Sequence, residues 1–271
     1  MSTTVRAVSR NGEKTRADTL ATEEPLEIRV QAGGERRTVA VTMRTPGNDF
    51  ELATGFLYGE GVIGKHEDVS SVRYCVDPDI GQEQQFNVVT VDLALPSLPE
   101  LGSLERHFYT TSACGVCGKA SLDAVESLGG PQLSDGPMVT RHVVLSLPHR
   151  LREAQRIFSK TGGLHAAALF DATGGLVEIR EDVGRHNAMD KLAGWGVLEK
   201  RVPFTDHAVL VSGRASFELL QKALRAGVSF FCAVSAPSSL AVDVANRFGM
   251  TLVGFLREEG FNVYAGEERL R

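Results

Sequence analysis

The second half of the chain repeats one unit, a strand followed by a helix, and this repetition restricts the possible folds more than any other feature. The units run through residues 175–195, 207–227 and 229–249, and a last strand is predicted at 251–257. The pairs Val211-Ser212 and Val234-Ser235 lie 23 residues apart. This spacing suits one helical crossover between neighbouring parallel strands. The alternation therefore predicts an α/β layered core over residues 148–271.

The first half of the chain has a different pattern. Residues 1–22 are polar and lack periodicity, which predicts a flexible tail. Residues 23–105 predict a smaller β-rich lobe with one helix. The elements expected here are a hairpin over 26–43, a helix capped by Asn48 that runs through Tyr58, and strands at about 69–76 and 85–95. A further helix is predicted at 151–160, closed by Gly162-Gly163.

Charge and hydropathy exclude several classes of protein. The net charge is −5 and the mean hydropathy is −0.07. No apolar run approaches the roughly 20 residues of a membrane helix, and the N-terminus lacks a secretory-type apolar stretch. We expect a cytoplasmic protein without a dedicated nucleic-acid or membrane surface.

A cysteine pair, Cys114-Gly115-Val116-Cys117, lies in a loop of small residues at 106–121. Two intervening residues let the sulfurs share a disulfide, a metal or a transferable sulfur atom. A structural zinc site normally needs four ligands, and Cys75 and Cys232 are single and lie in apolar strands. A thioredoxin-type pair normally opens a helix within a βαβ unit, and an incidental pair remains open. We favour a reactive thiol that carries a group, with Lys119 favouring its thiolate.

The segment His165-Ala166-Ala167 has alanine where zinc deaminases carry a catalytic glutamate. The cysteine pair also precedes this histidine, which reverses the deaminase order. The sequence therefore argues against a working deaminase and leaves His165 as a histidine of the core or of a pocket wall.

Three predicted strand–helix junctions carry groups that suit an anion. They are residues 181–187, 212–214 and 235–239. Ligands of open α/β sheets bind where strands end and helices begin, and helix starts attract anions. None of the three matches a P-loop or a dinucleotide fingerprint. They predict an anionic, nucleotide-like ligand.

The loop motif TTSACGVCGKAS resembles the formate dehydrogenase accessory sulfurtransferase family, called FdhD. Further matches lie at 162–171, 181–194, 211–224, 235–245 and 254–264, so that the resemblance covers roughly residues 25–270. It implies a cytoplasmic homodimer with a cytidine-deaminase-like α/β fold and no catalytic zinc. It also implies a sulfurtransferase that takes sulfur from a cysteine desulfurase as a persulfide and passes it to the molybdenum cofactor. That cofactor, Mo-bis(molybdopterin guanine dinucleotide), is bound as a substrate before it enters formate dehydrogenase.

The resemblance assigns roles to particular residues. We expect Cys114 to bear the persulfide, with Cys117 as helper or alternative bearer, on a loop that must be mobile to reach donor and metal. The segment linked to cofactor binding comprises Phe255, Leu256, Arg257, Glu258, Glu259 and Gly260. The helix-start argument adds Ser212, Arg214, Ser235 and Ser238. The alternative functions are a cofactor-binding chaperone without sulfur transfer and a disulfide oxidoreductase.

Overall fold

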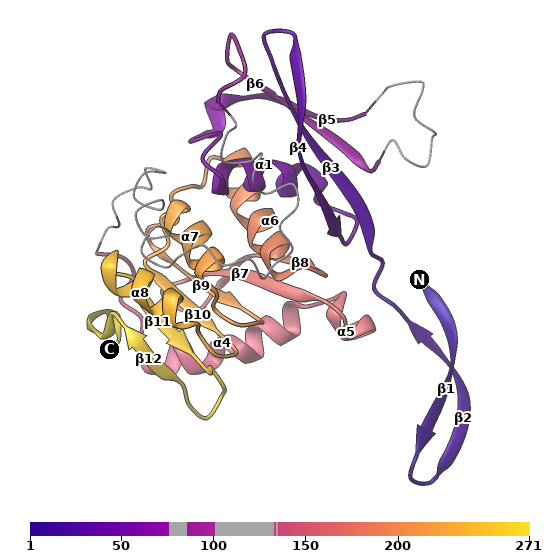
Figure 1. Cartoon of the computed structure of the whole chain (residues 1–271). Helices are drawn as coiled ribbons and strands as arrows, with labels where there is room; N and C mark the ends of the chain where they lie inside the picture. Colours follow the sequence, from indigo (N-terminus) through magenta and orange to yellow (C-terminus); the bar gives the residue numbers. More distant parts are fainter. Residues whose placement is uncertain (76–85, 101–132, 134) are drawn as a thin grey trace.

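The computed structural model describes residues 1–75, 86–100, 133 and 135–271 (Figure 1). These residues form a mixed α/β structure with a six-stranded sheet, a four-stranded sheet and a separate two-stranded hairpin. The cysteine loop at 106–121, including Cys114 and Cys117, lies outside the described residues.

The strands are β1 (Ser2–Ser9), β2 (Gly12–Thr19), β3 (Glu24–Ala32), β4 (Glu35–Arg44), β5 (Val69–Tyr74), β6 (Val88–Leu93), β7 (His165–Asp171), β8 (Leu176–Asp182), β9 (His207–Val211), β10 (Phe230–Ala233), β11 (Thr251–Gly254) and β12 (Asn262–Ala265). The helices are α1 (Asp49–Gly59), α4 (Arg141–Ala154), α5 (Phe158–Thr161), α6 (Arg185–Leu198), α7 (Phe217–Arg225) and α8 (Ser239–Arg247), with 3-10 turns η1 (His66–Asp68) and η2 (Glu267–Arg269).

The six-stranded sheet has the order β12-β11-β10-β9-β7-β8. The predicted parallel pairing is confirmed, since β9 and β10 are parallel and Val234 N donates to Val211 O at 3.0 Å. Strand β7 lies antiparallel to both of its neighbours, β8 and β9. The sequence did not predict β7, because five of its seven residues are buried and its three successive alanines give no alternation.

The sheet carries helices on both faces (Figure 1). Alternate strand residues point to opposite faces, so Ala167, Leu169, Val209 and Val211 join one core with α6, α7 and α8. Ala166, Ala168, Leu210 and Cys232 join a second core with Val144, Leu147 and Leu151 of α4.

Helix α4 corrects the prediction of a helix at 151–160. It begins after Thr140, whose hydroxyl accepts from Val143 N at 3.3 Å, and it ends before Gln155. Pro148 lies inside it. Proline removes one helical hydrogen bond, but the helix survives because its apolar face is buried on the sheet. The short helix α5 takes up the rest of the predicted segment.

The N-terminal lobe contains the expected elements. Strands β3 and β4 form the predicted hairpin in a sheet of order β4-β3-β6-β5, and α1 packs between this sheet and α6. Asn48 precedes α1 with a left-handed φ of 57°, and its side chain makes no capping hydrogen bond.

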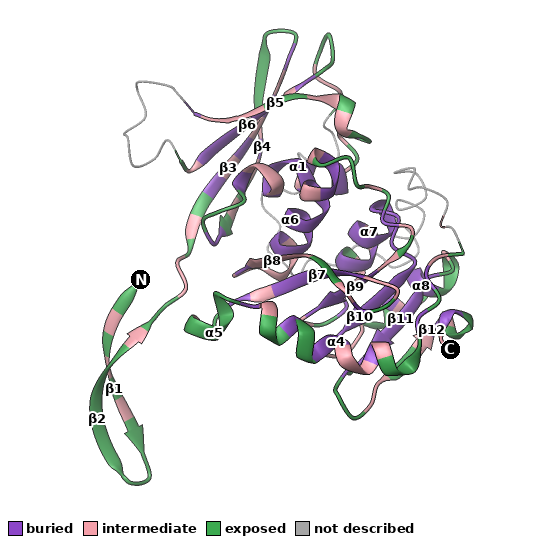
Figure 2. Cartoon of the chain, turned by 180° about the vertical axis from the view of Figure 1, so that it is seen from behind, coloured by how far each residue is buried: buried purple, intermediate pink, exposed green. Residues whose placement is uncertain are grey.

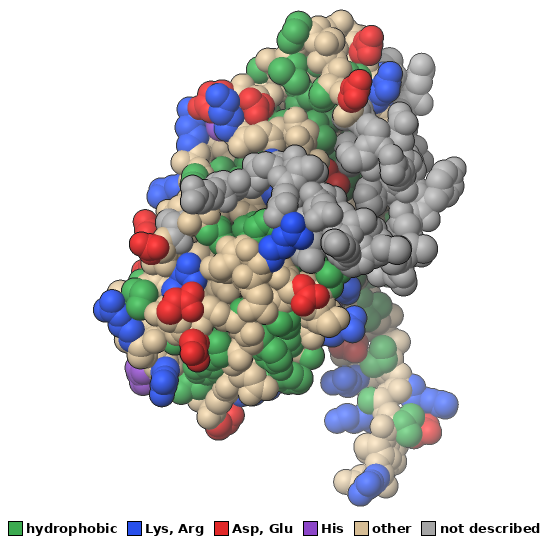
Figure 3. All heavy atoms as spheres, turned by 60° about the vertical axis from the view of Figure 1, so that its left-hand side comes forward, with side chains coloured by type: hydrophobic (Ala, Val, Ile, Leu, Met, Phe, Trp, Pro, Cys, Tyr) green, Lys and Arg blue, Asp and Glu red, His purple; other side chains and the backbone are tan. Residues whose placement is uncertain are grey.

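The first residues differ from the predicted tail because β1 and β2 form a regular antiparallel hairpin. Figure 2 shows that the hairpin is largely exposed, and Figure 3 shows Lys and Arg side chains along it. Most of its side chains are charged or carry a hydroxyl, and the apolar residues Val5, Ala7, Val8 and Ala17 are too few to give the apolar alternation by which a strand is recognised. Across the described ranges, no helix is both long and apolar enough to span a membrane.

Candidate functional site

The carboxyl ends of β8, β9, β10 and β11 lie at one edge of the six-stranded sheet, because these strands run in the same direction. The start of the antiparallel β7 lies among them. A cavity of about 550 Å³ opens at this edge. Its lining comprises Pro148, Leu151, Arg152, Gln155, Phe158, Gly162, Gly163, Leu164, His165, Ser212, Val234, Leu256 and Arg257. The strand-end location predicted for a ligand therefore contains a cavity.

The cavity brings together three of the predicted cofactor residues: Ser212, Leu256 and Arg257. Ser212 Oγ accepts from Ala166 N at 2.9 Å, which fixes the hydroxyl between β9 and β7. Leu256 is fully buried and forms an apolar part of the wall. The other predicted cofactor residues lie outside this lining.

Arg257 is held at the mouth of the cavity by backbone carbonyls. Its guanidinium donates to the carbonyl of Val234 and, at 2.9 Å, to that of Leu256. Its backbone N–H donates to Gly260 O at 2.9 Å and closes a turn. The exposed guanidinium therefore has a fixed position from which it can meet an anion.

A second cation of the lining, Arg152, approaches the predicted segment from the α4 side. Its guanidinium lies 3.7 Å from Glu258 Oε1, and both side chains are exposed. Because Arg152 lines the cavity, an anionic ligand there would compete with Glu258 for Arg152.

Phe255 lies beside the cavity in a strained conformation. Its φ is 52° and its residue is 46% exposed. A bulky side chain with positive φ is uncommon and costs roughly 1–3 kcal/mol. Its backbone N–H donates to Ser235 O at 3.1 Å, and Ser235 N donates to Gly213 O at 3.1 Å. The three strand ends are therefore joined to one another.

The remaining helix-start candidates have other surroundings. Ser238 is the N-cap of α8, and its hydroxyl accepts from Ala241 N at 3.2 Å. Arg214 is exposed to solvent. The cap accounts for the hydroxyl of Ser238 without a ligand.

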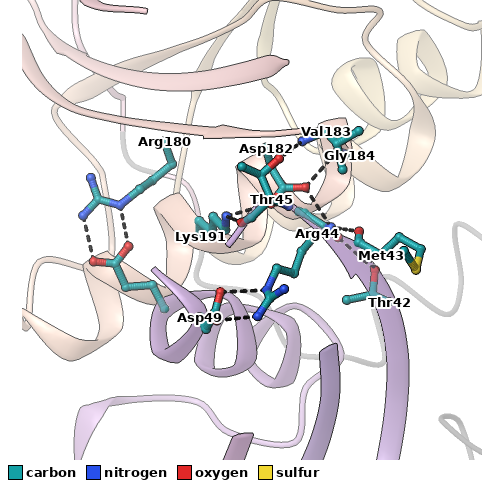
Figure 4. Close-up of polar contacts among 12 residues, drawn as sticks. Thr42, Met43, Arg44, Thr45, Asp49, Arg180, Asp182, Val183, Gly184 and Lys191 are labelled. Carbon is teal, nitrogen blue, oxygen red and sulfur yellow. Dashed lines mark hydrogen bonds and ion pairs between the residues drawn. The ribbon is translucent and has the colours of Figure 1, made fainter. Parts of the chain in front are cut away.

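The junction at 181–187 forms a buried connection between the lobe and the core (Figure 4). The Asp182 carboxylate pairs with Lys191 at 2.7 Å and accepts from Thr45 N at 3.1 Å. Its other oxygen accepts from Gly184 N at 2.8 Å and from Asn187 Nδ2 at 3.0 Å. Asp182 is thus fully occupied by the chain itself, while α6 begins at Gly184 without a side-chain cap.

His165 starts β7 and forms part of the cavity wall. Burial lowers its pKa, and the nearby charges of Arg185 and His186 lower it further. His186 itself lies 2.8 Å from Glu218, and this hydrogen bond lowers the pKa of Glu218. His165 therefore borders the cavity with a lowered pKa, and the His186–Glu218 pair lies near it.

Sequence reasoning missed the wall that α4 and α5 supply. Arg152, Gln155 and Phe158 line the cavity, although 151–160 read as an ordinary helix. The Gly162-Gly163 pair was the one local signal, since it marks a turn that returns the chain to the sheet edge. These side chains reach the cavity because α4 packs on sheet strands that are distant from it in the sequence.

The cysteines that the structure describes are poor candidates for sulfur chemistry. Cys75 and Cys232 are free and buried. Burial raises the pKa of the Cys232 thiol, which disfavours its reactive thiolate. In the described ranges, no group of three or more His, Cys, Asp or Glu residues could hold a metal ion. The reactive thiol expected from the sequence is therefore still assigned to the pair at 114–117, outside the described residues.

Comparison with known proteins gives consistent matches. The family model described as FdhD/NarQ family matches residues 21–271. Proteins named "Sulfur carrier protein FdhD" from Streptomyces avermitilis and Mycolicibacterium paratuberculosis are each 54% identical, over 260 and 257 residues. Each alignment covers 94% of this chain, with 90% of the first relative and 93% of the second. A protein with the same name from Sulfurisphaera tokodaii is 46% identical, and its alignment covers 93% of this chain and 92% of the relative.

A crystal structure of a protein described as a formate dehydrogenase accessory protein, from Desulfotalea psychrophila, has a similar fold. The TM-score is 0.76, with 24% identity, and the match covers 100% of this chain and 99% of that one. At this identity the likeness supports the fold.

Proposed function

Because this chain belongs to the FdhD/NarQ family, we propose that it is a sulfur carrier that serves the maturation of formate dehydrogenase. The proposal rests on sequence identity: proteins named as sulfur carriers are 54% identical to this chain over 94% of its length. The Cys114–Cys117 pair supplies thiols of the kind a carrier needs, whereas both described cysteines are buried.

The proposed carrier step is thiol–persulfide exchange with a cysteine desulfurase. The Cys114 thiolate attacks the outer sulfur of the donor persulfide, a new S–S bond forms, and the donor thiolate leaves. Cys117 then attacks the Cys114 sulfur and releases hydrosulfide to the metal. The resulting Cys114–Cys117 disulfide is reduced by a dithiol before the next cycle.

The proposed sulfur acceptor is Mo-bis(molybdopterin guanine dinucleotide), a substrate held at the sheet edge. Arg152 and Arg257 suit its phosphates, and the apolar cavity wall suits one of its ring systems. A cytidine-deaminase-like arrangement, a homodimer and a cytoplasmic location complete the proposal. The cavity of about 550 Å³ lies within the usual size range of small-molecule sites.

Intact-mass analysis after incubation with a desulfurase and cysteine tests the carrier role. We expect a gain of one sulfur atom that a reductant reverses, and we expect Cys114→Ala to lose it. Labelling that persists in both Cys114→Ala and Cys117→Ala would contradict the role. A double Cys→Ser variant that still delivers active cofactor would support a cofactor-binding chaperone instead.

A further inference from the structure

Gln155 is a buried amide that lacks a hydrogen-bond partner in the described part of the chain. The residue is 6% exposed, lines the cavity, and leaves its Nε2 unpaired. An unpaired buried polar group costs roughly 1–3 kcal/mol, and native chains pair nearly all such groups. The position therefore calls for a partner that comes from outside the described chain.

The backbone keeps this amide at the cavity wall. Gln155 is the C-cap of α4, and its N–H donates to Leu151 O at 3.1 Å. Its carbonyl accepts from Ser159 N at 3.0 Å. Both backbone groups of Gln155 are thus anchored, which fixes the position of this residue at the cavity wall.

The hydroxyl and guanidinium groups of the wall already have partners, and His165 is its one other polar side chain. Ser212 accepts from Ala166, Arg257 donates to two carbonyls, and Arg152 pairs with Glu258. The surrounding wall is apolar, with Pro148, Leu151, Leu164 and Leu256 buried in it. An apolar wall with one unpaired amide suits a flat ring that carries polar atoms along one edge.

We propose that Gln155 is the specificity-determining residue of the cavity and that it pairs with the lactam edge of a purine or pterin ring. A carboxamide presents a donor beside an acceptor, which complements the ring N–H beside the ring C=O of a lactam. This inference rests on the proposed function, whose substrate contains guanine and pterin, both of them lactams. Two hydrogen bonds form, and the unpaired Nε2 gains its acceptor.

The test compares the wild-type chain with Gln155→Met, an unbranched replacement of similar length. Affinities are measured by calorimetry for GDP, inosine diphosphate, purine riboside diphosphate and pyrophosphate. The first two carry the lactam, purine riboside diphosphate has the same phosphates without it, and pyrophosphate lacks a ring. We expect the wild type to favour both lactams over purine riboside diphosphate by about tenfold or more, as the loss of a buried pairing predicts.

In Gln155→Met, that preference should disappear while pyrophosphate affinity stays unchanged, which also shows that the site has folded. An unchanged preference in this variant overturns the inference and leaves sulfur transfer untouched. Failure of the wild type to bind GDP counts against the proposed cofactor site itself. Displacement of GDP by a free pterin identifies the pterin end as a source of the lactam, and no displacement identifies the guanine end.

Discussion

Lys191 Nζ lies 2.7 Å from Asp182 Oδ2, and both side chains are almost completely buried. The same ammonium donates to Thr45 O at 2.8 Å, while Thr45 N donates to the Asp182 carboxylate. Thr45 follows β4 of the N-terminal lobe, and Asp182 ends β8 of the large sheet. One buried ion pair thus joins the lobe to the core next to the strand ends that form the site.

Replacing Lys191 with Met should destabilise the fold by about 3–5 kcal/mol, because the Asp182 carboxyl group would remain buried without its ion-pair partner. Chemical denaturation followed by circular dichroism measures the change. Lys200→Met is the matched control, since Lys200 pairs with Glu67 at 4.0 Å on the surface. Such an exposed pair is worth about 0–1 kcal/mol. Equal stability of the two variants would contradict the joining role of Lys191.

Gly194→Ala should also destabilise the fold, because α1 and α6 cross where two glycines meet. A Cβ on Gly194 would lie 1.8 Å from Glu51 O, and one on Gly55 would lie 1.8 Å from Asp190 O. Both contacted atoms belong to the backbone and cannot move aside easily. The free energy of unfolding should therefore fall by at least about 1–3 kcal/mol, as for overpacked cores. Gly64→Ala is the control, since its Cβ would meet only Asp68 Oδ2 at 3.6 Å among the described atoms. Thermal unfolding of the two variants compares them directly.

Stability should fall as the pH drops from about 7.5 to about 5.5, partly through His165. Burial, with Arg185 and His186, lowers its folded pKa, so the unfolded chain binds the proton first. The stability that His165 contributes is fully present above its unfolded pKa of about 6.5. This stability is lost as the pH falls toward the folded pKa of His165. His165→Gln should therefore lose less stability over this interval than the wild type. Exposed His142 provides a comparison, and His142→Gln should follow the wild-type curve.

Ser238→Ala should lower the free energy of unfolding by about 1 kcal/mol. The Ser238 hydroxyl accepts a hydrogen bond from a backbone N–H of the first turn of α8, as at other N-cap serines. The neighbouring exposed Ser239 starts α8, and Ser239→Ala should change stability by less than about 0.5 kcal/mol. Urea denaturation distinguishes the two. A Ser238→Ala protein as stable as the wild type would show that the cap contributes little.

Glu258→Gln should raise the affinity for GDP by a few fold, because it frees Arg152 at the cavity mouth. The expected gain is small, since an exposed ion pair contributes about 0–1 kcal/mol. It should shrink at high salt, which screens exposed charges. Glu259→Gln is the control for the loss of one negative charge in the same segment. Equal gains in both variants would point to net charge instead of the Arg152 pair.

The large-scale fold was predictable because its signals are local. Buried strands alternating with amphipathic helices predicted β9, β10 and the helices that follow them. By contrast, β7 was missed because its alanines are buried on both faces, and the helix predicted at 151–160 misses most of α4, which contains Pro148. In each case, packing against a distant element outweighed the local preference.

The site was predictable in part for the same reason. Ser212 and Arg257 follow strand ends, and strand ends gather at one edge by topology. Gln155 carries no such mark, because only the packing of α4 on the sheet brings it to that edge. Lys191 carries no local signal of burial either, because its partner Thr45 comes from the N-terminal lobe, far away in the sequence.

The reversed direction of β7 gives the cavity two walls with separate origins. Strand ends supply the wall with Arg257, whereas the chain that enters β7 supplies the wall with Gln155. Under the proposed role of Gln155, exchanging residues 155–164 between relatives is expected to change which ring the cavity prefers. The crossover helices and Arg257 would stay in place, so the proposed ring recognition and the proposed phosphate contact would be expected to change independently of each other.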